Sequence, residues 1–479
     1  MREIYLKMSF LLDNIYDIVF LVAFVLFVSV FLYTHRKNVK KEGIMILYRS
    51  SFGIKAINYI GTRYKKFLSY FEWVIIIFGY FLMGLAIYLM IQLIGIFSVP
   101  EYVRAIKIPP IMPLIPYLPA LFKISFLPPL SFTYWIIVIL VAAAPHEFFH
   151  GIFAKIHGVK IKSTGFAFLG PFAGAFVEPD EKQVNKIKPK HQIAFLGAGT
   201  FANLLVGFIF VAIFWMFFAG FFVPSGVIFS SYTASIINVS QIESINPIQV
   251  SLAFDGIKMN FTEIKVNGKN YYTLNETIDE AKKTGAEEIG AYQDTPALKA
   301  GLAGVIISFN GKKISTLKDL DKAMSNTKPG DEIVIKTLYN EAEKEYKLTL
   351  IEHPQNSTKG YLGIATVNVK EMSFLKRTIN KLIFFKDPNT YYQPKFAGEF
   401  MLFIYNLLWW IVLVCFSVAI MNMLPLGPFD GGRVFYLTII WITKSEKAAK
   451  IGYRLSTYFF LGVFLLITFL WFLYYVILR

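Results

Sequence analysis

Six long apolar stretches alternate with polar loops along the chain. Each contains about eighteen or more mostly apolar residues, enough for an α-helix to cross a hydrocarbon core of roughly 30 Å. The pattern predicts a polytopic α-helical membrane protein with about six transmembrane helices, at 11–33, 71–97, 132–157, 192–222, 399–423 and 453–477. The first stretch is too long for the core of a cleavable signal, and its basic cluster follows it.

One long segment between the fourth and fifth predicted helices, 224–398, is polar and lacks a spanning run. Its pattern predicts an inserted α/β domain with a helical turn at 296–300, a strand at 305–309, a tight turn at 310–311, a helix at about 316–326 and a strand at 332–339. This order resembles a PDZ domain of the protease-associated type, and an unrelated small α/β module is the alternative. PDZ domains bind extended peptides or chain ends by adding a strand to a sheet.

These patterns divide the chain into five regions. They are 1–131 with the first two helices, 132–223 with the third and fourth, 224–370 as the PDZ-like domain, 371–398 as a linker, and 399–479 with the last two helices. In the linker, basic and apolar residues at helical spacing predict an interfacial helix on the outer leaflet, and a helix packed against the domain is the alternative.

The distribution of lysine and arginine predicts the orientation in the membrane. The loop between the first two helices is rich in both and holds a single acidic residue, Glu42, so we expect it in the cytoplasm. Alternation then places the basic loop 158–191 inside, and the N-terminus, the PDZ-like domain and the C-terminus on the extracytoplasmic side. The cell membrane is the expected location.

Composition agrees with a membrane protein. Of 479 residues, 55% are hydrophobic and only 17% are charged. The formal charge of +16 does not indicate a nucleic-acid partner, because the basic residues cluster beside apolar segments, where they set topology and meet anionic lipid. The single cysteine, Cys415, allows no internal disulfide.

The third predicted helix contains the sequence HEFFH at 146–150. Positions i and i+4 share a helix face, so His146 and His150 can bind one metal ion, and imidazole nitrogen suits zinc. Glu147 is then placed to accept a proton from a water that the metal acidifies. Three ionisable side chains inside a membrane helix cost about 2.5–3.5 kcal/mol each, which a bound metal would compensate. Hydrogen bonds between packed helices are the alternative explanation.

A third ligand is expected from the segment MNMLPLGPFDGGRVF, 421–435. Asp430 lies there in a turn rich in proline and glycine, and irregular backbone at membrane depth is tolerated where it is buried or lines a cavity. We predict that Asp430 completes the metal site; capping of the following helix is the alternative. Asn422 is expected to bind substrate or to stabilise the turn. His157 and His191, at the inner helix ends, are expected to be solvated or to reach toward the membrane surface.

HExxH in one membrane helix, together with NMLPLGPFDGG near a later one, resembles the site-2 protease family of intramembrane zinc metalloproteases. The resemblance covers the third to fifth helices and the segment between them. It implies one zinc ion per chain held by His146, His150 and Asp430, with Glu147 as the catalytic residue. In FLGAGTFANLL it places Asn203 near the active site, with Thr200 where the family often has proline.

His146 lies about 14 residues into its helix, so at about 1.5 Å per residue the site is roughly 20 Å below the outer surface and nearer the cytoplasm. A membrane-spanning helix of another protein reaches that depth more easily than a soluble peptide. Residues 163–179 predict a membrane-dipping hairpin whose edge would pair with an unwound substrate, a feature with a counterpart in the family; a plain loop is the alternative.

The resulting prediction is an intramembrane zinc metalloprotease of regulated intramembrane proteolysis. Its partners would be transmembrane substrates already cut by another protease. Zinc would polarise the scissile carbonyl, Glu147 would transfer the proton, and Asn203 or Asn422 would support the oxyanion. A metal-ion transporter and an inactive PDZ scaffold are the rival hypotheses. Neither requires a base such as Glu147 beside a ligand.

Overall fold

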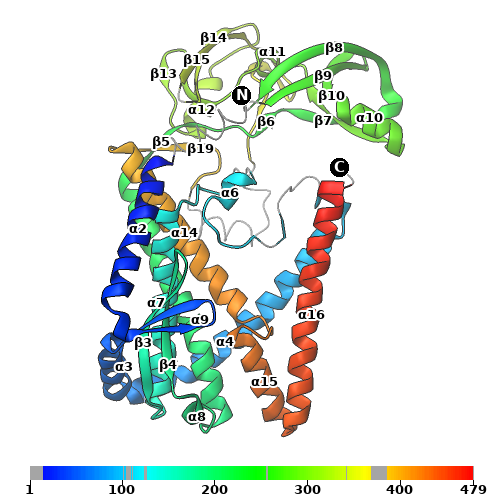
Figure 1. Cartoon of the computed structure of the whole chain (residues 1–479). Helices are drawn as coiled ribbons and strands as arrows, with labels where there is room; N and C mark the ends of the chain where they lie inside the picture. Colours follow the sequence, from blue (N-terminus) through cyan, green and yellow to red (C-terminus); the bar gives the residue numbers. More distant parts are fainter. Residues whose placement is uncertain are drawn as a thin grey trace. The chain divides into compact units, whose positions relative to one another are not determined.

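The computed structural model describes residues 14–100, 102–103, 109–110, 112–122, 124, 127–254, 257–340, 342–367 and 386–477, with the side chains of 247–254, 257–260 and 476–477 excluded. The chain forms two compact units (Figure 1). The first comprises Met1–Met216 and Phe403–Arg479, and the second is Phe217–Leu402.

Six helices are long and apolar enough to cross a membrane, as predicted. They are α2 (Ile15–Thr34), α4 (Lys65–Phe97), α7 (Phe132–Ile156), α9 (Pro189–Phe221), α14 (Gly398–Asn422) and α16 (Glu446–Phe472). α4 and α16 begin six and seven residues before the predicted starts, because each helix continues through polar residues at its end. A shorter helix, α15 (Asp430–Thr443), separates α14 from α16.

A four-stranded antiparallel sheet accompanies these helices, in the order β1-β2-β3-β4. The predicted hairpin at 163–179 is present as β3 (Ile161–Leu169) and β4 (Phe172–Pro179), with Gly170 in the left-handed region of the turn. The sequence did not predict the second hairpin, β1 (Val39–Glu42) and β2 (Met45–Ser50), whose strand β2 pairs with β3. Among the described residues no strand pairs with the other edge of β4, which runs along α7.

The N-terminus of α7 is fixed by a carboxylate from another helix. Asp17 in α2 accepts hydrogen bonds from the backbone N–H groups of Phe132 (2.7 Å) and Thr133 (2.8 Å), and from the Thr133 hydroxyl (2.5 Å). The Tyr117 hydroxyl donates to the same carboxylate. The first N–H groups of a helix have no partner within the helix, so Asp17 satisfies two of them and locks α7 to α2.

The second unit contains two larger antiparallel sheets. One has the order β7-β11-β10-β9-β8 and the other β15-β14-β12-β5-β19. The strands are β5 (Phe222–Val227), β7 (Ala234–Asn238), β8 (Ile242–Phe254), β9 (Ile257–Val266), β10 (Lys269–Leu274), β11 (Glu288–Gln293), β12 (Val305–Phe309), β14 (Glu332–Tyr339), β15 (Ala342–Thr349) and β19 (Thr390–Pro394).

The elements predicted for 296–339 are all present. α11 (Pro296–Lys299), β12, α12 (Leu317–Met324) and β14 follow in the expected order around a core that includes Ile306 and Ile335. The likeness of this unit to a PDZ domain stays a prediction. The basic first half of the predicted interfacial helix falls on 371–385, outside the described residues, and β19 pairs with β5 in the part that follows.

Candidate metal centre

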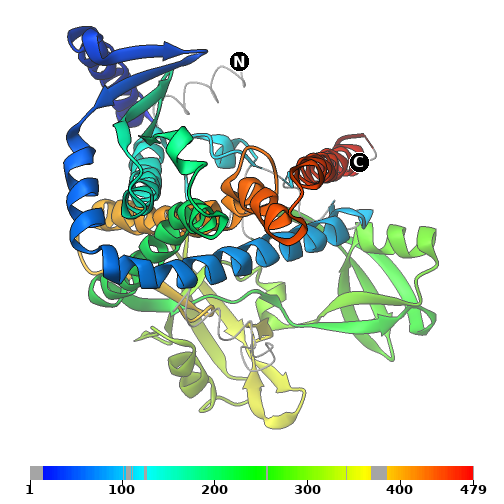
Figure 2. The ribbon, with the colours of Figure 1, turned by 90° about the horizontal axis from the view of Figure 1, so that it is seen from below.

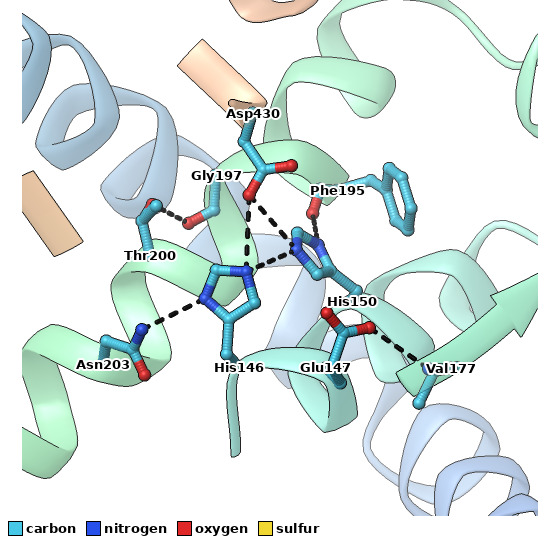
Figure 3. A network of polar contacts seen from close by, with 9 residues as sticks. All are labelled: His146, Glu147, His150, Val177, Phe195, Gly197, Thr200, Asn203 and Asp430. Atoms are coloured by element: carbon cyan, nitrogen blue, oxygen red, sulfur yellow. Dashed lines mark hydrogen bonds and ion pairs between the residues drawn. The ribbon is translucent and has the colours of Figure 1, made fainter. Parts of the chain in front are cut away.

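Three ligand atoms from α7 and α15 converge on one point (Figure 3). The Nε2 atoms of His146 and His150 are 3.1 Å apart, and each lies 3.4 Å from Oδ2 of Asp430. Both histidines are buried, with 8% of their surface exposed. The structure therefore brings together the three residues that the sequence predicted as ligands.

The separations fit a metal ion. Tetrahedral zinc binds nitrogen and oxygen at about 2.0–2.2 Å, which places two ligand atoms of one ion roughly 3.3–3.5 Å apart. The second ring nitrogen of His150, Nδ1, lies 2.7 Å from the Phe195 carbonyl oxygen. A carbonyl only accepts, so Nδ1 carries the proton and Nε2 keeps its lone pair for the metal.

Asn203 of α9 is the partner of Nδ1 of His146, as the Phe195 carbonyl is for His150. Its side-chain nitrogen, Nδ2, is placed 3.1 Å from Nδ1 of His146 (Figure 3), but the nitrogen and oxygen of an amide can exchange positions; Asn203 is fully buried. Ligation through Nε2 leaves a proton on Nδ1, so the amide oxygen must face this ring and accept that proton. The NH2 group then occupies the other amide position, which has no hydrogen-bond partner in the described structure. Asn203 thus contacts His146, and its predicted support of the oxyanion stays a prediction.

Gly199 provides the space beside the histidines, and sequence reasoning did not single it out. A Cβ atom at this position would lie 2.4 Å from Nε2 of His150 and 2.6 Å from Nε2 of His146. Any side chain would therefore occupy the place where the ligand atoms converge. α9 continues through the neighbouring Thr200, whose hydroxyl donates to the Gly197 carbonyl at 2.8 Å.

Two glycines allow Asp430 to reach the histidines. Asp430 is the first residue of α15, and its carboxylate does not cap that helix. A Cβ on Gly431 would lie 2.3 Å from the Met423 carbonyl, and one on Gly432 would lie 2.4 Å from the Leu426 carbonyl. The start of α15 can approach the end of α14 so closely because both positions lack side chains.

Glu147 connects the centre to the sheet. Its Oε2 accepts a hydrogen bond from the Val177 N–H of β4 at 3.1 Å. Its other carboxylate oxygen lies on the side of the histidines in Figure 3. One oxygen is thus held by the edge of β4, and the second remains available to a water at the centre.

The remaining candidates lie elsewhere. Asn422 is the last residue of α14, and the described structure gives its side chain no hydrogen-bond partner. His157 and His191 are not simply solvated as predicted, because both contact the buried carboxylate of Glu72. Sequence reasoning missed Glu72 because it lies seven residues into α4, far along the chain from both histidines.

The chain combines six helices of membrane-spanning length with a buried site of two histidines and one aspartate. A glutamate is adjacent to the first of these histidines. These features are those of a membrane metallopeptidase. The model of peptidase family M50 matches residues 134–464 of the chain. The chain belongs to this family, which is the site-2 protease family predicted from its motifs.

A relative in Methanocaldococcus jannaschii, uncharacterized protein MJ0971, is 25% identical over 327 residues. The match covers 67% of this chain and spans 62% of the length of that relative.

Proposed function

We propose that the chain is an intramembrane zinc metalloprotease, which hydrolyses peptide bonds within or near the transmembrane helices of other membrane proteins. One observation carries this proposal: His146, His150 and Asp430 meet at a single point inside the helical unit, with Glu147 adjacent. Family membership supports it, since the M50 match covers both α7 and α15.

His146, His150 and Asp430 would hold one zinc ion. When bound, the ion would act as a Lewis acid and lower the pKa of a coordinated water. The protein residues perform the proton transfer. Glu147 takes a proton from the attacking water through its free oxygen and delivers it to the nitrogen of the leaving amine. Its bond to Val177 fixes the carboxylate during both steps.

The edge of β4 is the proposed substrate-binding strand. The Val177 N–H points away from β3, and backbone groups alternate along a regular strand, so those of Ala173 and Ala175 point to the same open edge. An unwound substrate segment would pair with these groups and pass beside Glu147. β2 occupies the outer edge of β3, and no described strand pairs with the other edge of β4, so a substrate strand would be added there.

The second unit is proposed to act on substrates from the extracytoplasmic side as a PDZ-like domain. A groove of about 230 Å³ lies between α12 and the strand β17 (Asn356–Tyr361) with the residues that follow it. Leu320 and Met324 line one side, and Leu362 and Ile364 line the other. Such a groove suits an extended peptide, such as the end left by an earlier cut, and a filter against bulky outer domains is the other proposed role.

Two variants test the proposed reaction. Purified wild-type, Glu147→Gln and Asp430→Ala proteins would be compared for zinc content and for cleavage of single-span proteins in liposomes. We expect Glu147→Gln to retain zinc and lose cleavage, and Asp430→Ala to lose both. Cleavage by the Glu147→Gln protein at the wild-type rate would refute the proposal.

The transporter hypothesis is tested with the same samples. Zinc uptake into the liposomes should be equally low for wild-type and Glu147→Gln proteins. Substantial flux in both, without proteolysis, would favour transport instead.

A further inference from the structure

A second group of side chains able to bind a metal lies at the C-terminal end of α7, beyond the metal centre. Glu72 of α4, His157 just after α7 and His191 of α9 place one ligand atom each within 4.8 Å of the others. Oε1 of Glu72 is 2.6 Å from Nε2 of His157, and Oε2 is 2.7 Å from Nδ1 of His191. Figure 2 looks onto the lower ends of these helices.

Glu72 is buried, so its negative charge must be balanced by nearby positive groups or by a metal ion. Only 3% of its side chain is exposed, compared with 15% for His157 and 29% for His191. A carboxylate withdrawn from water is costly unless it is paired or binds a metal. The partial exposure of His191 leaves a route by which an ion and water can enter.

Glu72 contacts both histidines directly, at distances typical of ion pairs. Neither Oε1 of Glu72 nor Nε2 of His157 has another hydrogen-bond partner in the described structure. The rings of His157 and His191 lie 4.1 Å apart between centroids. Ligand atoms of one zinc ion lie roughly 3.3–3.5 Å apart, so binding would require the two imidazoles, now 2.6 and 2.7 Å from the Glu72 oxygens, to move apart from this carboxylate.

We propose that Glu72, His157 and His191 form a second, structural zinc site, independent of the proposed function. Two imidazoles and a carboxylate are a common zinc donor set, and water would complete the tetrahedron. His157 lies seven residues after His150, so at 1.5 Å per residue the two sites are roughly 10 Å apart along α7. The ion would join α4, α7 and α9; α7 carries two ligands of the metal centre, and α9 carries Asn203, which contacts His146.

Metal analysis of the full-length protein in detergent tests this site. Purified without chelators in the presence of zinc, the wild type should hold about two zinc ions per chain, one for each set of three protein ligands. The double variant His146→Ala/His150→Ala should lose the first ion and keep the second. Loss of all zinc from that double variant would overturn the proposal.

A matched pair at His191 separates ligation from hydrogen bonding. His191→Cys supplies a thiolate that binds zinc, whereas His191→Gln can donate a hydrogen bond to Glu72 but is a poor zinc ligand. We expect His191→Cys to retain the second ion and His191→Gln to lose it. Equal zinc content in wild type and both variants would show that the cluster is only hydrogen-bonded.

A measurement without substitutions covers the case in which a variant does not fold. Cobalt titrated into metal-depleted wild-type protein should give two saturating steps in the visible absorption of tetrahedral Co²⁺, and a single step would contradict the presence of two metal sites. The wild type could also hold one ion in total. If that ion is retained in the His146→Ala/His150→Ala variant and lost in His191→Gln, the result would support the second site and refute the proposed catalytic site.

Discussion

Both histidines of the metal centre are held by acceptors at Nδ1. For His150 the acceptor is a backbone carbonyl, and for His146 it is the side chain of Asn203. Each partner determines which ring nitrogen keeps its lone pair, so both Nε2 atoms are directed to the same point before any ion binds. The site is therefore preorganised by hydrogen bonds that a list of ligands does not include.

Asn203 can be tested by separating its acceptor from its shape. Asn203→Asp keeps an oxygen for the proton on Nδ1 of His146, whereas Asn203→Leu removes it. We expect the zinc affinity of Asn203→Leu to fall by about 10–100-fold, with Asn203→Asp much closer to wild type. Competition with a zinc chelator measures both. Equal affinities for wild type and Asn203→Leu would contradict the orienting role.

Gly199 should tolerate no side chain. In Gly199→Ala the new methyl group would contact both Nε2 atoms, so we expect loss of zinc from the metal centre and loss of proteolysis. Gly220→Ala in the same helix is the control, because a Cβ there has no neighbour within 4 Å. Zinc content and cleavage rate are the readouts, and an active Gly199→Ala protein would disprove this packing.

At the scale of single residues, the sequence predicts those site residues that stand together in a short motif. His146 and His150 follow from one helical turn, and Asp430 from an acid in a glycine–proline turn between apolar segments. The cluster around Glu72 could not be predicted, because it depends on how three helices pack. Gly199 was equally inaccessible, since only the structure shows that the histidine rings face it.

Among the elements, α7 is fixed from several sides. Asp17 binds its N-terminus, and α3 (Phe52–Arg63) and β4 pack against its lower half. A Cβ on Gly151 would lie 2.6 Å from Ile57 of α3 and 3.1 Å from Val177 of β4. The helix that carries HExxH is therefore held in a close-packed site next to the strand proposed to bind substrate.

The contact between β4 and Glu147 predicts a specific effect of proline. Val177→Pro removes the N–H that binds Glu147, and proline is tolerated where an edge strand donates no ladder hydrogen bond. We expect kcat to fall at least tenfold with zinc content unchanged. Ala175→Pro should instead raise KM, because it removes an N–H proposed for substrate. An unchanged kcat for Val177→Pro would show that Glu147 needs no such anchor.

Helix α12 in the second unit predicts a pH effect. The Thr316 hydroxyl and the backbone N–H groups of Thr316 and Ser315 donate to Asp319 and lower its pKa. A lowered pKa means that this stabilisation is present above the unfolded pKa of about 4 and is lost as the pH falls through the folded value. Asp319→Asn should speed hydrogen exchange of the α12 amides at pH 7, while wild type and variant should converge at low pH. A difference that persists after Asp319 is protonated would contradict this origin.

The sequence predicted local elements better than their pairing. Alternation and a glycine–proline turn gave the β3–β4 hairpin, and the Asn310–Gly311 turn gave its flanking strands. The addition of β1 and β2 could not be seen, because strand pairing over more than a hundred residues leaves no local pattern. In the part of the chain that the structure describes, this pairing leaves the other edge of β4 without a partner strand.

At the scale of the whole chain, hydropathy predicted the main division. Six membrane-length helices belong to one unit or lead from it, and the polar segment between α9 and α14 forms the other. The three ionisable side chains of HEFFH lie in an apolar helix of membrane-spanning length. Such groups are stable there only with partners, which a metal centre would supply. Under the proposed function, the same depth would limit the substrate to a chain that is already in the membrane.

The position of the cut in a substrate is the most direct test of this account. A single-span protein with a truncated outer domain would be incubated in liposomes with wild-type or Glu147→Gln protein, and the products identified by mass spectrometry. The account predicts a cut within or near the membrane-spanning segment, made by the wild type and absent with Glu147→Gln. Cuts confined to soluble regions, or products that do not depend on Glu147, would contradict it.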